Sequence, residues 1–165
     1  MYSGHLTDVA NIAVGHKEDE AAGTGVTVIL APKGSTAGVD VRGGAPGTRE
    51  CVLLGPTYAV SEVHAIVLSG GSAFGLDSAT GVMEALRDDG IGFDVGVGVV
   101  PIVPAAVLFD LTYKKADAWP DKAMGRAAYE AASSGDKRQG AIGAGTGTTV
   151  AKTMGPAYAK KSGVG

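Results

Sequence analysis

The apolar residues of this chain gather in short runs that glycine and proline interrupt. Residues 26–30 (Val-Thr-Val-Ile-Leu) and 64–68 (His-Ala-Ile-Val-Leu) are rich in β-branched side chains and bounded by turn residues, which predicts two buried strands. Residues 105–109 form a third candidate strand. Residues 36–41 (Thr-Ala-Gly-Val-Asp-Val) are predicted to pair with residues 26–30 as a hairpin across a turn at residues 33–35.

Two segments have helical spacing instead. In residues 76–86 apolar side chains recur every three or four positions, and Gly90 lies where such a helix would stop. A second helix is predicted to start near residues 120–121 (Pro-Asp), to run through Ala131 and to stop at Gly135. Strands before and between two helices indicate a mixed α/β class. The many alanines and glycines at apolar positions predict layers that approach closely, as in stacked sheets.

The composition fits a globular unit, and we predict residues 1–165 as a single portion with no internal boundary. Hydrophobic residues make up 45% of the chain, charged residues 19%, and the net charge is −3, which excludes a disordered tail and argues against a nucleic-acid partner. The longest apolar run, residues 95–111, is broken by two glycines and two prolines and is a poor membrane span.

The ends of the chain and its cysteine content bear on location and processing. Cys51 is the single cysteine and permits no internal disulfide, and the N-terminus lacks a basic region followed by an apolar one, so a cytoplasmic setting is predicted. Residues 157–165 end on a turn-like run with no final helix or strand. We therefore expect a processed or truncated polypeptide.

A glycine-rich turn at residues 69–77 (Ser-Gly-Gly-Ser-Ala-Phe-Gly-Leu-Asp) joins a predicted strand directly to a predicted helix. Such a turn places backbone N–H groups, here of Gly70, Gly71 and Ser72, beside a helix N-terminus, where anionic or carbonyl groups bind. Residues 140–149 form a second glycine-rich segment. Two loops of flexible backbone in one small chain indicate a site rather than a passive scaffold.

Several familiar sites are missing from the sequence. The three histidines lack the i, i+4 spacing of a helical metal site. Cys51 has apolar neighbours, which favours a core thiol over a nucleophile. Ser72 lacks the flanking glycines of the G-x-S-x-G elbow. Asp40 and Arg42 are spaced to pair, which favours a structural turn over a substrate clamp.

Lys152 is a candidate for chemistry. Residues 147–153 partly match a phosphate loop, but Ala151 and Thr146 stand where that motif requires glycine. Lys152 lies among apolar and hydroxyl residues, and partial burial there would lower its pKa and fit it for general-base work or anion stabilisation. The alternative is a solvated surface lysine.

Four motifs, taken in order, resemble the self-processing L-aminopeptidase/D-esterase family, which includes β-aminopeptidases and the nylon-oligomer hydrolases. They are residues 40–45 (Asp-Val-Arg-Gly-Gly-Ala), 69–77, 103–110 (Val-Pro-Ala-Ala-Val-Leu-Phe-Asp) and 143–147 (Gly-Ala-Gly-Thr-Gly). The resemblance covers nearly all of this chain, but it matches only about the first half of a typical family precursor.

This resemblance implies an αββα four-layer sandwich that a second chain or C-terminal segment, absent from this sequence, completes. It implies a precursor that cuts itself, so that the second chain begins with a threonine or serine. The hydroxyl of that residue is the nucleophile, and its free amine helps to activate it. An asparagine that assists the oxyanion is also expected beyond Gly165. The present chain alone is then catalytically incomplete, and no metal or cofactor is implied.

The resemblance also implies roles for individual residues. Lys152 matches a lysine implicated at the active site of the nylon-oligomer hydrolases. Phe109 stands where those hydrolases have tyrosine, so it keeps the ring, loses the hydroxyl donor and is expected to be a pocket wall. Phe74 is expected to line the same region, with core packing as the alternative. The candidate substrate-binding residues are Gly70, Gly71, Ser72, Phe74, Phe109, Gly145 and Thr146.

Three functions remain open. The first is the N-terminal portion of an amidase or aminopeptidase that acts on small peptides or related amides, assembled as a homo-oligomer. The second is a binding module whose glycine-rich loops hold an anion or nucleotide without chemistry. The third is an inactive structural partner chain. The residues that follow Gly165 would distinguish them, because an Asn-Thr or Gly-Ser junction entering an apolar strand favours the first.

Overall fold

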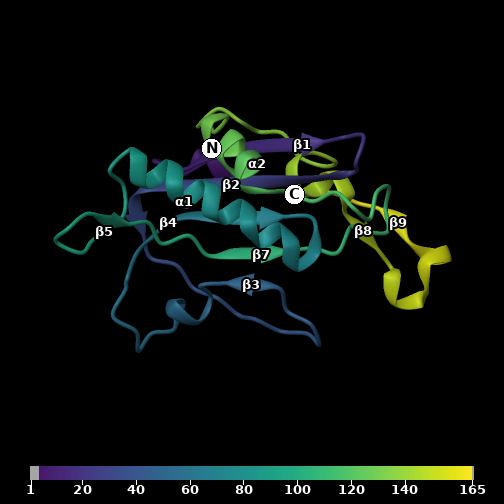
Figure 1. Ribbon diagram of the computed structural model, residues 1–165, viewed down its shortest axis with the longest axis horizontal. Helices are drawn as coiled ribbons and strands as arrows, with labels where there is room; N and C mark the ends of the chain where they lie inside the picture. The colour runs from purple at the N-terminus through teal and green to yellow at the C-terminus, as the bar shows by residue number, and fades with distance from the viewer. Residues whose placement is uncertain (1–3, 165) are drawn as a thin grey trace.

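The computed structural model of the protein describes residues 4–164, and a five-stranded sheet forms its centre (Figure 1). The strands are β1 (Ala13–Asp19), β2 (Thr24–Ser35), β3 (Thr48–Arg49), β4 (Val63–Ser69) and β7 (Ala105–Val107). Their order across the sheet is β1-β2-β4-β7-β3. β4 and β7 run parallel, and every other neighbouring pair is antiparallel, so the sheet is mixed.

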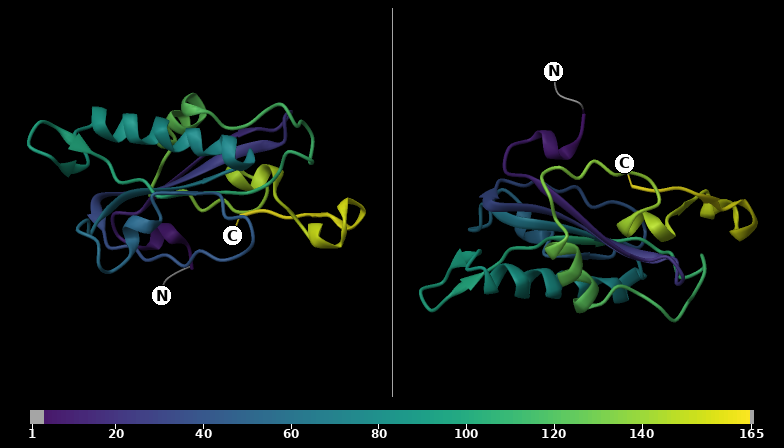
Figure 2. Two further views of the ribbon diagram at one scale, coloured as in Figure 1. Left: turned by 60° about the horizontal axis from the view of Figure 1, so that its bottom comes forward. Right: turned by 90° about the horizontal axis from the view of Figure 1, so that it is seen from above.

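Both α-helices, α1 (Ser78–Asp88) and α2 (Lys122–Glu130), cover the same face of this sheet (Figure 2). Apolar side chains of β2 and β4 meet those of the helices between the two layers and form the core. Its largest fully buried aliphatic members include Val26, Val28, Val67, Val82 and Leu86.

Glycines allow these layers to approach closely. Gly81 of α1 lies against the carbonyl of Lys122, and Gly125 of α2 lies against the carbonyl of Ser78, so a Cβ at either position would collide with backbone. Gly15 of β1 packs in the same way on α2. The close approach predicted from composition is therefore present, but it joins helix to helix and helix to strand rather than two stacked sheets.

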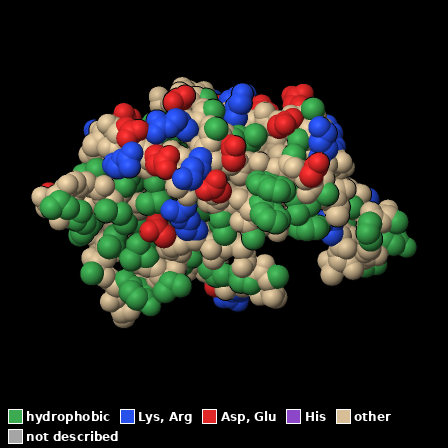
Figure 3. Space-filling model, in the orientation of Figure 1, with side chains coloured by type: hydrophobic (Ala, Val, Ile, Leu, Met, Phe, Trp, Pro, Cys, Tyr) green, Lys and Arg blue, Asp and Glu red, His purple; other side chains and the backbone are tan. Residues whose placement is uncertain are grey.

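The outer surface of the helices is charged (Figure 3). Glu84 of α1 pairs with Lys122 of α2 at 3.4 Å, and Asp88 pairs with Arg126 at 2.7 Å. Exposed pairs of this kind contribute little to stability, but they mark a solvated surface.

The opposite face of the sheet also carries apolar side chains. The register sets Ile29 beside Ile66 and Leu68 beside Ala106, so these side chains share the face turned away from the helices. All four are only partly buried. A sheet that carries apolar residues on both faces is typical of a layer that is covered on both sides.

Smaller elements extend from the edges of the sheet. One hairpin pairs β5 (Phe93–Asp94) with β6 (Val99–Val100), and another pairs β8 (Thr149–Val150) with β9 (Lys160–Lys161). Short 3₁₀ helices connect the elements. They are η1 (Leu6–Asp8), η2 (Val52–Leu54), η3 (Ser72–Asp77), η4 (Gly143–Gly147), η5 (Lys152–Met154) and η6 (Pro156–Tyr158).

The predicted strands at residues 26–30 and 64–68 are confirmed, because they lie within β2 and β4. The predicted hairpin of residues 36–41 with residues 26–30 is wrong. β2 continues to Ser35, its two edges pair with β1 and β4, and residues 36–41 lie outside any strand.

The helix predictions hold except at one end. Gly90 has φ +73° and follows the C-cap of α1, as expected of a stop. α2 starts after Asp121, whose side chain accepts a hydrogen bond from Met124 N at 2.9 Å. The predicted stop at Gly135 is wrong, because α2 ends at Glu130 and the backbone of Ser133 then pairs with that of Val14.

The predicted strand at residues 105–109 is shorter than expected, since β7 ends at Val107. Residues 1–3 and Gly165, which bear on the expectations about the chain's ends, lie outside the described residues. Among residues 4–164, neither α-helix combines the length and apolar character that a membrane crossing requires.

Candidate functional site

The candidate site lies at one edge of the sheet, where β4 and β7 both end. Because these strands are parallel, the chain leaves both at the same edge, with Ser69 and Val107 side by side. Leu108 N donates to Ser69 O at 2.9 Å, which keeps the two exits together. Thr24, at the start of the antiparallel β2, lies at this edge as well.

Asp110 connects these segments. Its side chain is buried, accepts a hydrogen bond from Thr24 Oγ1 at 2.7 Å and accepts another from Gly71 N at 2.7 Å. Gly70 and Gly147 both pack so closely on this carboxylate that a Cβ at either position would collide with it. Asp110 therefore brings the two glycine-rich loops to one point.

The N–H groups of the first turn are already engaged. Gly70 N donates to Gly25 O at 2.9 Å, Gly71 N to Asp110, and Ser72 N to Leu108 O at 3.0 Å. Gly71 and Ser72 have positive φ, +80° and +55°, so the turn is sharp. The protein's own carboxylate thus takes a donor that the sequence had suggested for an external anion.

The second loop, η4, is buried throughout. Gly145 O accepts a hydrogen bond from Lys161 Nζ at 2.7 Å. Burial, and secondarily the nearby Lys114, lowers the pKa of Lys161. Thr146 is 6% exposed, and its hydroxyl has no hydrogen-bond partner within residues 4–164. Buried hydroxyls are normally paired, so this oxygen is available to a further group.

Lys152 and Phe109 lie together. Lys152 Nζ donates to Phe109 O at 2.7 Å and lies 5.9 Å from the centre of the Phe109 ring. Lys152 is partly buried, and Ala151 before it has φ +62°, a left-handed conformation. The carbonyl and the ring together hold the ammonium group in place.

Phe74 is exposed rather than packed in the core. Its ring is 56% exposed and stacks on Trp119, with centroids 4.4 Å apart. Gly71 lies against Trp119 and Pro120, so this aromatic pair borders the glycine turn. The alternative of core packing for Phe74 is therefore wrong.

Other candidates from the sequence lie elsewhere. Asp40 and Arg42 do pair, at 2.6 Å, but both side chains are largely exposed. Cys51 is partly buried beside Ala105 rather than deep in the core. Across the described part of the chain, histidine, cysteine, aspartate and glutamate side chains form no group of three that could hold a metal ion.

The structure thus brings Phe109, Lys152 and the two glycine-rich loops to one end of the molecule. Sequence reasoning missed Asp110, although the residue closes one of the motifs that carry the family resemblance. Its partners Thr24 and Gly71 are 86 and 39 positions away, so no local pattern reveals the connection.

Comparison with known proteins gives a consistent family. Residues 4–158 match the model of Peptidase family S58. An uncharacterized aminopeptidase of Mycobacterium tuberculosis is 45% identical over 148 residues, which are 85% of this chain and 43% of that protein. A 6-aminohexanoate-oligomer endohydrolase of Paenarthrobacter ureafaciens is 37% identical over 145 residues, which are 88% of this chain and 38% of that protein. The chain spans less than half the length of these relatives.

Solved structures share the fold. The L-aminopeptidase D-Ala-esterase/amidase of Ochrobactrum anthropi, described as a variant of the Ntn-hydrolase fold, superposes with a TM-score of 0.71 at 18% identity, over 87% of this chain and 44% of its own. A β-aminopeptidase of a Burkholderia species superposes with a TM-score of 0.67 at 20% identity. The match covers 89% of this chain and 43% of the β-aminopeptidase chain. The mixed α/β class is confirmed, and the chain supplies one helix layer and one sheet of a larger sandwich.

Proposed function

We propose, from the premise that this chain belongs to peptidase family S58, that it is the N-terminal portion of a self-processing amide hydrolase. The complete protein, as we use the term, is this chain together with the C-terminal portion that its longer relatives have. Its substrates are small peptides or related amides, cleaved at the N-terminal residue. The nucleophile is a threonine or serine at the start of the C-terminal portion, whose free amine activates its hydroxyl.

The observation that carries this proposal is the convergence at the edge of the sheet. Lys152, Phe109 and the two glycine-rich loops come from three distant parts of the sequence and meet where β4 and β7 end. Residues at the carboxyl ends of parallel strands commonly form ligand sites in α/β proteins. We further propose that the C-terminal portion adds a second sheet. The apolar side chains on the sheet face opposite the helices support this, because they are only partly buried.

Each residue has a role in the proposed reaction. The nucleophile attacks the substrate carbonyl carbon, the amine leaves with a proton, and water later hydrolyses the acyl-enzyme. Lys152 supports the proton transfer or the developing negative charge. Phe109 and the Phe74–Trp119 pair form apolar walls.

The glycine residues have a different role from the one that their N–H groups first suggested. The donors of Gly70, Gly71 and Ser72 are used within the chain, so these residues shape the wall of the site. Gly145 and the unpartnered hydroxyl of Thr146 remain candidates for contact with substrate or with the C-terminal portion. A pure anion-binding module that uses the N–H groups of Gly70, Gly71 and Ser72 is disfavoured, because all three donate within the chain.

The assembly and location stay predictions. We propose a homo-oligomer in the cytoplasm, with the C-terminal portion as the first partner and a small peptide or amide as substrate.

The role of Lys152 is tested by Lys152→Met in the complete protein. We expect turnover of aminoacyl amides to fall by roughly 10²-fold or more, the usual scale for a lost acid–base group. The fold should persist, because methionine occupies the space of the aliphatic stem. Measured kcat values with a panel of aminoacyl amides give the answer.

Lys160→Met is the matched control. Lys160 lies in the same hairpin and is exposed, and its side chain has no hydrogen bond or ion pair with residues 4–164. Its replacement should leave kcat within about twofold, the range of a change at a solvated side chain away from such features. If Lys152→Met and Lys160→Met behave alike, Lys152 has no part in the reaction.

A further inference from the structure

A second polar centre lies away from the site described above, on the sheet face opposite the helices. A cavity of about 360 Å³ opens there. Its floor includes Val14, Ile29 and Leu68 of the sheet, and His16 and Thr27 add polar groups to it. The segments around η1 and at residues 136–139 form its sides. Neither Lys152 nor Phe109 lines it.

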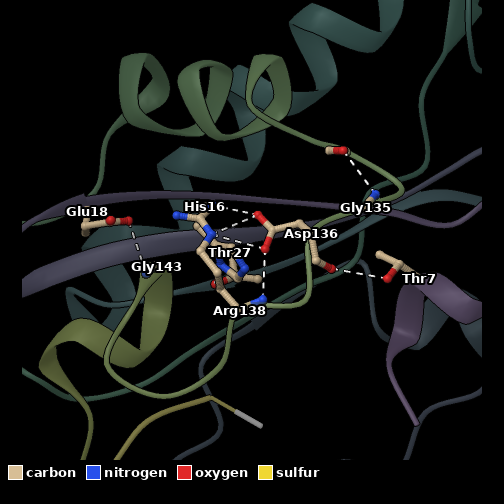
Figure 4. A network of polar contacts seen from close by, with 9 residues as sticks. Thr7, His16, Glu18, Thr27, Gly135, Asp136, Arg138 and Gly143 are labelled. Carbon is tan, nitrogen blue, oxygen red and sulfur yellow. Dashed lines mark hydrogen bonds and ion pairs between the residues drawn. The ribbon is translucent and has the colours of Figure 1, made fainter. Parts of the chain in front are cut away.

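His16, which lines this cavity, has an unsatisfied atom. The residue is 6% exposed, and its Nε2 has no hydrogen-bond partner within residues 4–164. Nδ1 lies 2.9 Å from Thr27 Oγ1 (Figure 4). A buried imidazole nitrogen without a partner is costly, so such atoms normally meet a further group.

The neighbours of Thr27 determine which nitrogen carries the proton. Thr27 Oγ1 accepts a hydrogen bond from Ala144 N at 3.1 Å, and its only other partner within the described residues is His16 Nδ1. The hydroxyl hydrogen is therefore satisfied only if it points to Nδ1, which must then be the acceptor. In the neutral ring the proton lies on Nε2, so the unsatisfied atom is an N–H donor.

The charged groups around the ring are themselves paired. Asp136 lies in the wall and holds Arg138 through Nη2 at 2.6 Å. Glu18 accepts a hydrogen bond from Gly143 N at 3.3 Å. These contacts leave the buried Nε2 of His16, a residue that lines the cavity, with an acceptor still to be supplied.

We propose that this cavity is a socket for a segment of the C-terminal portion, and that His16 Nε2–H donates a hydrogen bond to a carbonyl or carboxylate oxygen of that segment. The inference rests on the proposed function and names the contact by which the two portions recognise each other. His16 is then a positioning residue for the second sheet.

Two observations favour this occupant over a second copy of the chain. The cavity floor is the apolar sheet face, and the matched relatives and solved structures are more than twice as long as the part that this chain covers. Val164, whose backbone pairs with Gly140, also lines the cavity, so a continuing chain would emerge at its rim.

A photo-cross-link identifies the occupant. Val9 lines the cavity and is 60% exposed, so Val9→p-benzoylphenylalanine in the complete protein places a reactive group there without disturbing the core. Peptide mapping after irradiation should find it joined to the C-terminal portion of the same molecule. Val97, 97% exposed and outside the cavity, is the control position and should give no such product. A product between two copies of residues 1–165, or none with the C-terminal portion, overturns the proposal.

Substitution of His16 tests the hydrogen bond. His16→Leu removes the donor, and the urea-induced separation of the two portions should shift to reflect an affinity about tenfold or more weaker, because an acceptor is left buried and unpaired. His16→Gln keeps a donor near the Nε2 position and should stay within about threefold of the parent. Equal effects of Leu and Gln, or no effect of either, overturn the proposal.

The protonation of His16 can also be measured in the wild-type protein, so this test does not depend on whether a variant folds. Ring ¹⁵N chemical shifts report the tautomer: a proton on Nε2 agrees with the proposal, and a proton on Nδ1 overturns it. Failure of the proposed function is seen separately. If the cross-link and the His16 effects appear as expected but aminoacyl amides are not hydrolysed, the socket stands and the amidase assignment falls.

Discussion

Phe109 lies at the candidate site and is partly exposed to solvent. Its ring is 48% exposed, and its carbonyl accepts the hydrogen bond from Lys152. The position of the lysine thus depends on the backbone of Phe109, while the ring contributes a wall and a weak attraction for the ammonium group. Changes to the ring should affect binding more than folding.

We predict that Phe109→Tyr holds or raises turnover, because it adds a hydroxyl that can donate to an oxyanion and barely changes the volume. Phe109→Ala should raise KM but destabilise the complete protein by well under the ~3–5 kcal/mol typical of a buried phenylalanine, since the ring is half exposed. Steady-state kinetics and urea unfolding measure both. Wild-type KM for the alanine variant would show that the ring does not bind substrate.

The residues of the site were predictable to different degrees. Lys152 and Phe109 could be found because their motifs resemble a family, and the structure brings the two into contact. The donors of Gly71 and Ser72 could not be judged from sequence, since their acceptors are on Asp110 and Leu108, far along the chain. A motif indicates backbone shape, whereas tertiary contacts decide which donors remain free.

The crossing of α1 and α2 is a close contact between elements. Gly81 and Gly125 each face a backbone carbonyl of the other helix segment, and neither position leaves room for a methyl group. The two glycines lower intrinsic helix propensity, and the close packing offsets that cost. This contact holds α2 on the sheet next to β1.

We predict that Gly81→Ala destabilises the complete protein by about 1–3 kcal/mol, the usual range for overpacking, despite the higher helix propensity of alanine. Gly38→Ala is the control, because no atom lies within 4 Å of its added Cβ and its φ is not positive. Urea unfolding curves of the two variants decide. An increase in stability for Gly81→Ala would mean that the helices can separate at no cost.

Elements were more predictable than their pairing. The apolar β-branched runs revealed β2 and β4, because composition and turn residues are local signals. The false hairpin at residues 36–41 arose because periodicity does not tell which strand takes which edge. β2 is paired by β1 on one side and β4 on the other, and this leaves no edge for the following segment.

At the scale of the whole molecule, the two faces of the sheet differ. The helix-covered face is closed, and the helices carry ion pairs on their outer surface. The other face carries half-buried Ile29, Ile66 and Leu68 and the cavity with His16. The class of fold was predictable from sequence, whereas the asymmetry between the faces required the strand register.

The stability of the complete protein should fall as the pH drops below about 6.5. Burial lowers the pKa of both His16 and His64 from the ordinary value of 6.5, so the folded protein binds fewer protons than the unfolded chain in that range. For His64, Nδ1 accepts a hydrogen bond from Ile102 N at 3.1 Å, which protonation would break. The stability that depends on keeping these two histidines neutral is therefore fully present above pH 6.5.

Urea midpoints at pH 7.5 and 5.5 measure this dependence. We expect a lower midpoint at pH 5.5, and a smaller difference between the two midpoints for His64→Gln than for the parent. Equal midpoints for the parent protein at the two pH values would contradict the prediction.

Intact-mass spectrometry of the complete, catalytically active protein tests the self-processing most directly. We expect two chains whose masses sum to that of the precursor plus one water, the second beginning with threonine or serine. A single uncut chain in a preparation that turns over aminoacyl amides, or a second chain with any other first residue, would contradict the assignment of this chain as the N-terminal portion of a self-processing hydrolase.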